Sequence, residues 1–209
     1  MKKLNGEREI KYELFGHIRM DQCAINMVAV CFWMEAKALG QVARFLIAMA
    51  ELLERGESHW ERVCLSEWDP EWSAEHPDAD VIVLNRNYDH YSVPPLSVKR
   101  EPPGDLFPPS QTVQDANEER EIKYELSGHI TMKECAIDLM AVCFWMEPKA
   151  LRQIARFLLE MADLLETGKF DTDHHHLSSW DEQWYSEHPD ADVIVLNPYW
   201  TVEDYYKVP

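Results

Sequence analysis

Residues 7–20 read EREIKYELFGHIRM, and residues 119–132 read EREIKYELSGHITM. The correspondence continues without a gap through residues 85 and 197, and about two thirds of the paired positions carry the same amino acid. A long unit that occurs twice is typical of a tandem duplication, whereas a solenoid needs at least three shorter repeats. The chain therefore contains two copies of one structural unit.

The duplication divides the chain into a first repeat over residues 7–94 and a second repeat over residues 119–209. Residues 95–118 are rich in proline and contain few large apolar side chains, which favours an extended, partly stiff linker. Each repeat is long enough to fold alone, so we expect two similar domains. Because a duplication often fuses a former twofold pair, the repeats are candidates for an intramolecular pseudo-dimer.

The hydrophobic pattern of each repeat predicts two strands, then a helix, then two further strands. Ile10, Tyr12 and Leu14 alternate with charged residues, which is typical of a half-exposed strand. Residues 23–34 are apolar on both faces and rich in β-branched and aromatic side chains, as expected of a central strand. Apolar residues then recur at helical spacing between residues 39 and 53.

Helix-boundary residues support this assignment in both repeats. Pro148 lies in the expected first turn of the second helix, and Gly56 and Gly168 lie where C-terminal caps belong. Residues 60–68 and 81–84 complete the unit as two strands. The expected fold class is α+β, a tandem duplication of a small β-β-α-β-β domain with one helix packed on a mostly antiparallel sheet.

The charge of the chain restricts its partners. Its 209 residues include 20 Lys and Arg against 38 Asp and Glu, which gives a formal net charge of −18. This acidic excess argues against binding to DNA, RNA or anionic lipid, because phosphate-binding surfaces need clustered Lys and Arg. We therefore expect no nucleic acid and no membrane among the partners, but a protein with a basic surface.

The cysteines and the N-terminal sequence favour a cytoplasmic protein. The chain has 5 cysteines without a CxxC pair, which fits buried, reduced thiols better than a disulfide framework. No apolar stretch follows Lys2 and Lys3, so no secretory signal is expected. No apolar run approaches the ~20 residues that a membrane-spanning helix needs.

Motifs for catalysis are missing from the sequence, which contains no GxSxG, HExxH, P-loop or GxGxxG pattern. The histidines common to both repeats are His17 and His129, and His76 and His188. No Ser or Cys nucleophile is paired with them, so we expect structural roles and no enzyme. The DTDHHH stretch at residues 171–176 contains possible metal ligands, but residues 59–64 of the first repeat do not keep it. We therefore predict no cofactor and no metal site, while metal binding by His174–His176 stays open.

One segment of each repeat combines tryptophans with carboxylates, a composition that favours a binding surface as well as a structural role. Residues 65–80 read LSEWDPEWSAEHPDAD, and residues 177–192 read LSSWDEQWYSEHPDAD. Trp supplies anchor area at protein interfaces, while carboxylates select Arg and Lys on a partner. The alternative is that the tryptophans fold back as a lid over the core, and both roles can hold for different residues. The predicted partner-binding residues are Trp68, Asp69, Trp72, Glu75 and Asp78, with Trp180, Asp181, Trp184, Glu187 and Asp190 in the second repeat.

The motifs ARFLxxMAxLLExG and WDxxWxxEHPDADVIVLN occur in both repeats, and they resemble those of bacterial polymorphic-toxin immunity proteins. This resemblance implies a non-enzymatic protein that binds and neutralises a cognate toxin or effector domain. It transfers no functional residue. The alternative is a phage or host regulatory binding module, such as an anti-defence protein or a nucleic-acid mimic.

Overall fold

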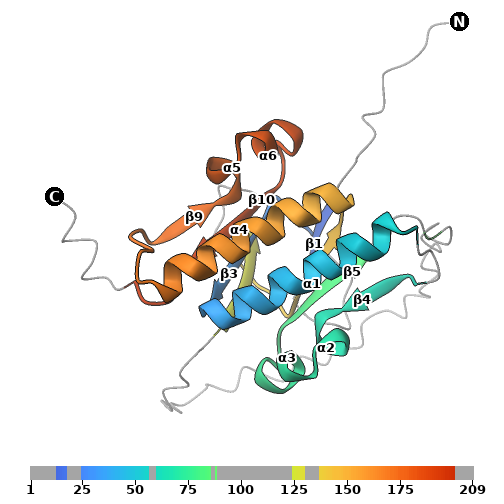
Figure 1. Cartoon of the computed structure of the whole chain (residues 1–209), viewed down its shortest axis with the longest axis horizontal. Coiled ribbons are helices and arrows are strands. Elements are labelled where there is room, and N and C mark those ends of the chain that lie inside the picture. Colours follow the sequence, from blue (N-terminus) through green and yellow to red (C-terminus); the bar gives the residue numbers. More distant parts are fainter. Residues whose placement is uncertain are drawn as a thin grey trace, which may run out of the picture.

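The computed structural model describes residues 13–17, 25–56, 60–85, 88, 124–129 and 137–200. Two long helices lie side by side across two five-stranded sheets, and two pairs of short helices lie at opposite ends of the molecule (Figure 1). The chain is α+β, with strands and one long helix in each repeated region. The predicted linker at residues 95–118 lies outside the described residues.

The elements of the two repeats follow the same order. The first repeat contains β1 (Glu13–His17), β2 (Ile25–Asn26), β3 (Ala29–Met34), α1 (Ala36–Glu54), β4 (Arg62–Cys64), α2 (Leu65–Trp68), α3 (Pro70–Glu75) and β5 (Asp80–Leu84). The second repeat contains β6 (Tyr124–His129), β7 (Ile137–Asp138), β8 (Ala141–Trp145), α4 (Pro148–Glu166), β9 (His174–His176), α5 (Leu177–Trp180), α6 (Glu182–Glu187) and β10 (Asp192–Leu196).

Both long helices begin and end where the sequence indicates. Pro148 occupies the first turn of α4, where its missing N–H removes no intrahelical hydrogen bond. Gly56 and Gly168 follow the two helices with φ of 69° and 66°, a conformation that glycine adopts without steric cost. Among the described residues, the helices are too short or too polar to cross a lipid bilayer.

The strand expected over residues 60–68 is shorter than predicted. It contains only β4, and residues 65–68 form the helical turn α2. This part of the prediction was wrong because a short apolar run fits a strand and a helical turn equally well. The last predicted strand, residues 81–84, is confirmed as β5, whose central residues are buried.

Each sheet takes strands from both repeats. The strand orders are β2-β1-β8-β5-β4 and β7-β6-β3-β10-β9. The central strand β3 pairs antiparallel with β6 and parallel with β10, both from the second repeat. The central strand β8 pairs in the same way with β1 and β5 of the first repeat. The expectation that each repeat forms its own sheet was therefore wrong, because each sheet is shared between the repeats. Both sheets contain parallel as well as antiparallel pairs.

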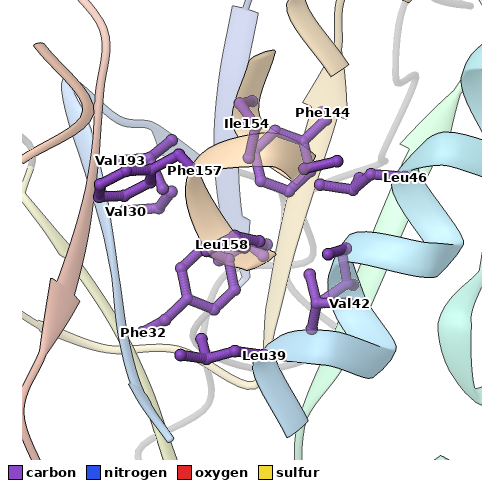
Figure 2. Packing of buried hydrophobic residues seen from close by; sticks show 14 of the residues in the cluster. Val30, Phe32, Leu39, Val42, Leu46, Phe144, Ile154, Phe157, Leu158 and Val193 are labelled. Carbon is purple, nitrogen blue, oxygen red and sulfur yellow. The ribbon is translucent and has the colours of Figure 1, made fainter. Parts of the chain in front are cut away.

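One large hydrophobic cluster joins the helices to both sheets. Leu39, Val42 and Leu46 of α1 belong to the same buried cluster as Phe157 and Leu158 of α4 (Figure 2). The strands contribute further fully buried side chains to this cluster, including Val30, Phe32, Phe144 and Val193. Because the cluster contains side chains of both repeats, the apolar burial that stabilises one repeat depends on the other.

The described cysteines are packing residues. Cys31, Cys64 and Cys143 are buried residues of the sheets, at most 5% exposed. Burial raises the pKa of Cys64 to about 11 and that of Cys143 to about 12, so both thiols are protonated at neutral pH. Cys23 and Cys135 lie outside the described residues.

Candidate functional site

The predicted partner-binding residues lie in two equivalent segments, residues 65–80 and residues 177–192, which we call the Trp/acid segments. Each segment contains two short helices and leads into a buried strand, β5 or β10. The helices α2 and α3 lie at one end of the molecule, and α5 and α6 lie at the other (Figure 1). The chain therefore presents the same local structure twice.

An aspartate separates the two short helices of each segment. Asp69 has an extended backbone (φ −123°, ψ 101°), and its carboxylate accepts hydrogen bonds from the backbone N–H groups of Glu71 and Trp72, at 3.0 and 3.4 Å. This is an N-terminal cap, which satisfies amides that the first helical turn leaves unpaired. Asp181 caps α6 in the same way, with distances of 2.9 and 3.3 Å.

The second tryptophan of each segment belongs to the core. Trp72 and Trp184 are 0% exposed. The indole N–H of Trp72 donates to the carbonyl oxygen of Ala79 at 2.9 Å, and that of Trp184 donates to Ala191 over the same distance. Each indole also stacks on a histidine ring, His76 or His188, at a centroid distance of 4.0 Å. Both indoles are therefore packed in the core, as the lid alternative expects of them.

The first tryptophan of each segment remains accessible. Trp68 is 42% exposed and Trp180 is 37% exposed. Each indole rests against a buried phenylalanine of a long helix, Phe45 or Phe157, at a centroid distance of 5.7 Å. One side of each ring is thereby held in place while the rest faces solvent. The side chain would therefore lose less conformational entropy when a partner binds to it.

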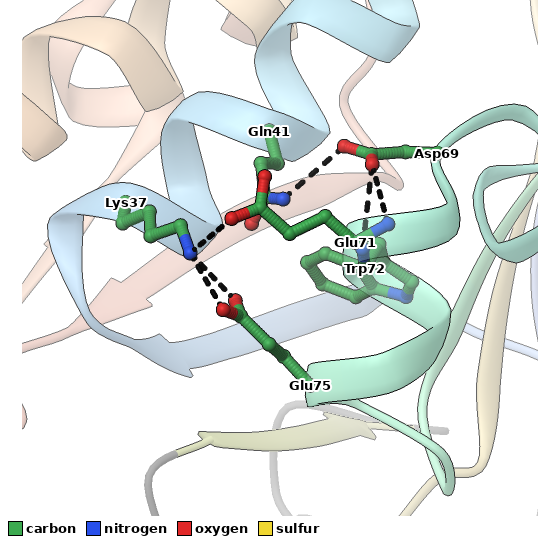
Figure 3. Close-up of polar contacts among 6 residues, drawn as sticks. All are labelled: Lys37, Gln41, Asp69, Glu71, Trp72 and Glu75. Carbon is green, nitrogen blue, oxygen red and sulfur yellow. Dashed lines mark hydrogen bonds and ion pairs between the residues drawn. The ribbon is translucent and has the colours of Figure 1, made fainter.

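Polar side chains tie the Trp/acid segments to the long helices, as Figure 3 shows for the first repeat. Gln41 donates to Asp69 at 3.1 Å, and the Lys37 ammonium binds Glu71 at 2.8 Å and Glu75 at 2.7 Å. The hydrogen bonds that Lys37 donates to Glu71 and Glu75 raise the pKa of Lys37, which stays charged. All three side chains are exposed, so this ion pair orients Glu75 more than it stabilises the fold.

The second repeat keeps most of this arrangement. Gln153 donates to Asp181 at 2.9 Å, and Lys149 binds Glu187 at 2.7 Å. Burial alone would raise the pKa of Asp181, but the hydrogen bonds from Gln153 and from two backbone amides outweigh it and lower that pKa. The Lys149 hydrogen bond likewise holds the pKa of Glu187 below its usual value. Both carboxylates therefore remain charged at neutral pH.

A further aspartate anchors the other end of each segment. Asp80 accepts from the backbone N–H and the hydroxyl of Ser66, at 3.0 and 2.6 Å. Asp192 binds Ser178 in the same way and also contacts His176 at 2.7 Å. The segment is thus held at both ends by carboxylates that accept several hydrogen bonds. These contacts preorganise the exposed side chains between them.

The structure sorts the ten predicted residues into groups with different surroundings. Trp72 and Trp184 are buried, Asp69 and Asp181 cap helices, and Glu75 and Glu187 pair with lysines. Trp68, Trp180, Asp78 and Asp190 are the members that remain exposed without such a role in the contacts described above. A partner-binding role for the ten residues stays a prediction, and these four are the ones whose side chains have the fewest structural contacts.

The residues that position the segments were not among the predicted binding residues. These are Lys37, Gln41, Ser66 and Asp80, and their counterparts are Lys149, Gln153, Ser178 and Asp192. A signal for them was present, because each of these polar residues is identical in the two repeats. Identical polar residues on the two helices indicated shared contacts.

The histidine run on β9 binds neighbouring side chains. The rings of His174 and His176 are 4.9 Å apart, and their Nδ1 atoms contact Asp173 at 2.9 Å and Asp192 at 2.7 Å. His175 packs edge-on against Phe170. Within the residues that the structure describes, no group of three or more His, Cys, Asp or Glu side chains is arranged to hold a metal ion.

Acidification will destabilise the fold through buried histidines. Burial lowers the pKa of His76, His175 and His188 below the ordinary value of 6.5. The unfolded chain therefore binds protons more readily than the folded chain as the pH falls below 6.5, and stability is lost in that range. We expect the urea midpoint to fall between pH 7 and pH 5. His175→Val, which introduces the residue found at Val63, will reduce this fall, and an unchanged midpoint in the parent chain would contradict the prediction.

Comparison with known proteins gives one result. A family model described as Immunity protein 32 matches residues 35–87 and again residues 147–198, together half of the chain. Each match runs from the start of a long helix through the Trp/acid segment to the strand that follows it. No curated protein and no solved structure matches the chain.

Proposed function

Because the chain belongs to the Immunity protein 32 family, we propose that it binds a toxin domain and neutralises it in the bacterial cytoplasm. The observation that carries this proposal is the family match in both repeats, which covers the Trp/acid segment each time. We propose a stoichiometric inhibitor and not an enzyme. In support, Asp69 caps a helix, Glu75 pairs with Lys37, and His76 stacks on Trp72, so these titratable side chains have structural partners.

We propose that the toxin contacts the exposed side chains of the Trp/acid segments. Trp68 and Trp180 have the area and the partial fixation of interface anchors. Exposed carboxylates accompany them, including Glu67 and Asp78 in the first repeat and Glu182 and Asp190 in the second. Such a surface fits a partner whose Lys or Arg side chains lie beside an apolar patch.

The exchange of strands supports the proposal that the repeats are an intramolecular pseudo-dimer. Every pairing that β3 makes has a counterpart at β8 with the repeats interchanged. The two Trp/acid segments would then be related by the same approximate twofold operation. A pseudo-dimer of this kind can present two equivalent contact surfaces to one or two toxin molecules.

A growth assay tests neutralisation. The genes that neighbour the gene for this chain are searched for a toxin domain, and that domain is expressed in a bacterial host with and without the chain. We expect growth only when both are present, and we expect the two proteins to copurify. Continued toxicity at a matched level of the soluble chain would contradict the proposed function.

The association rate will depend strongly on salt. A net charge of −18 accelerates encounter with a basic partner, and salt screens this attraction over a Debye length of ~30 Å at 0.01 M but only ~3 Å at 1 M. We expect the association rate constant, measured by stopped-flow fluorescence, to fall about tenfold or more over this range. An association rate constant that does not change with salt concentration would contradict electrostatic steering.

A further inference from the structure

The central strands of the two sheets have no neighbour from their own repeat. β3 lies between β6 and β10, and β8 lies between β1 and β5. Among the described strands, the pairings left inside the first repeat are the β1–β2 and β4–β5 ladders. The second repeat keeps the corresponding β6–β7 and β9–β10 ladders. A separated repeat would therefore lose every pairing of its most buried strand.

That loss would expose both edges of an apolar strand. Val30, Cys31 and Phe32 of β3 are at most 3% exposed, and Val142, Cys143 and Phe144 of β8 are equally buried. An apolar strand with two unpaired edges leaves its N–H and C=O groups to water and favours pairing with another chain. Isolated two-stranded ladders are also marginal in water.

The packing of the two long helices also makes each repeat depend on the other. α1 and α4 share one buried cluster, and they lie side by side over the sheets (Figure 1). Glu54 at the end of α1 accepts from Arg152 of α4 at 2.6 and 3.1 Å. The Arg152 hydrogen bond lowers the pKa of Glu54, so this carboxylate stays charged beside the arginine.

We infer that each repeat is the obligate folding partner of the other, and that the surface buried between them fits a copy of the same repeat. The inference does not depend on the proposed toxin. In the intact chain, the occupant of this surface is the other repeat. A repeat separated from it would refold only by taking a second copy of itself.

The first test cleaves the intact, folded chain. A specific protease site is inserted within residues 95–118, and the purified chain is cut there after folding. We expect both fragments to elute together at the size of the intact chain and to unfold in one transition by circular dichroism. Fragments that separate without denaturant and retain helical structure would overturn the inference.

The second test uses native cysteines to show that strands of one repeat pair with strands of the other. Phe15 pairs with Cys143, and Ser127 pairs with Cys31, in each case across the repeats. Directly paired residues in antiparallel strands have Cβ atoms about 4.5–5.5 Å apart, close enough for disulfide formation after a small shift.

We therefore expect Phe15→Cys, oxidised with copper phenanthroline and then cut in the linker, to give fragments that stay joined on a non-reducing denaturing gel. Leu14→Cys is the matched control, because Leu14 pairs with Phe144 and not with a cysteine. If the fragments stay joined only in the Leu14→Cys control, or in neither variant, the pairing of β1 with β8 across the repeats is contradicted.

Discussion

Trp72→Ala or Trp184→Ala will lower the free energy of unfolding by about 3–5 kcal/mol, the range typical of a buried tryptophan replaced by alanine. Both side chains are 0% exposed, and their indole N–H groups donate hydrogen bonds at 2.9 Å to the backbone carbonyl oxygens of Ala79 and Ala191. The substitution creates a cavity and leaves that carbonyl unpaired. Urea unfolding followed by circular dichroism measures the loss.

Trp68→Ala is the matched control for Trp72→Ala. Trp68 is 42% exposed and rests on the core with only part of its ring. We expect a smaller loss of about 1–2 kcal/mol, because 42% of Trp68 is already in contact with water, so its removal uncovers less apolar area than the removal of the fully buried Trp72. Equal losses for the two variants would contradict the assignment of Trp72 to the core and Trp68 to the surface.

The double substitution Trp68→Ala with Trp180→Ala will weaken toxin binding by about 30- to 1,000-fold, which corresponds to about 2–4 kcal/mol at an interface anchor. The physical reason is the loss of preoriented aromatic area at the surface that we propose for the contact. Surface plasmon resonance with the toxin domain measures the dissociation constant. The urea midpoint of the same variant shows whether the fold is retained.

Single substitutions will show whether the two surfaces contribute equally. The second repeat has Tyr185, which is 63% exposed, where the first repeat has Ser73. Tyr185→Ser makes that position the same in both repeats and removes one exposed aromatic ring. If Trp180→Ala and Tyr185→Ser each weaken binding while Trp68→Ala does not, the second segment carries the contact. Unchanged binding in all three variants would exclude the Trp/acid segments as the toxin-binding surface.

The long helices and the strand that follows each Trp/acid segment were predictable from local pattern. Helical spacing of apolar residues, Pro148 at the first turn and glycines after the last turn all indicate the same boundaries. Residues 81–84 form a short apolar run after a polar loop, and they are buried in β5. In these places local preference and tertiary packing favour the same structure.

The pairing of strands was not predictable from the pattern. Alternation of apolar and polar residues indicates which face of a strand is buried, but not which strand lies beside it. Here the difficulty is greater because the two repeats carry nearly the same strands, so β1 presents similar residues to β3 and to β8. Only the three-dimensional arrangement shows that β1 pairs with β8.

The two tryptophans of a segment also illustrate a limit of spacing arguments. Trp68 and Trp72 are four residues apart, which would place them on one face of a continuous helix. The extended backbone at Asp69 ends α2 and starts α3, so the two indoles belong to different helices. One indole then points into the core and the other to solvent.

Toxin binding is measured directly by calorimetric titration of the purified chain with a purified toxin domain identified among the neighbouring genes. We expect a saturable complex, and we expect the Trp68→Ala, Trp180→Ala double variant to bind at least about 30-fold more weakly although it remains folded, with only a modest fall in the urea midpoint. A parent chain that gives no binding heat and no complex on gel filtration would contradict the claim. Undiminished affinity in the folded double variant would contradict the proposed surface.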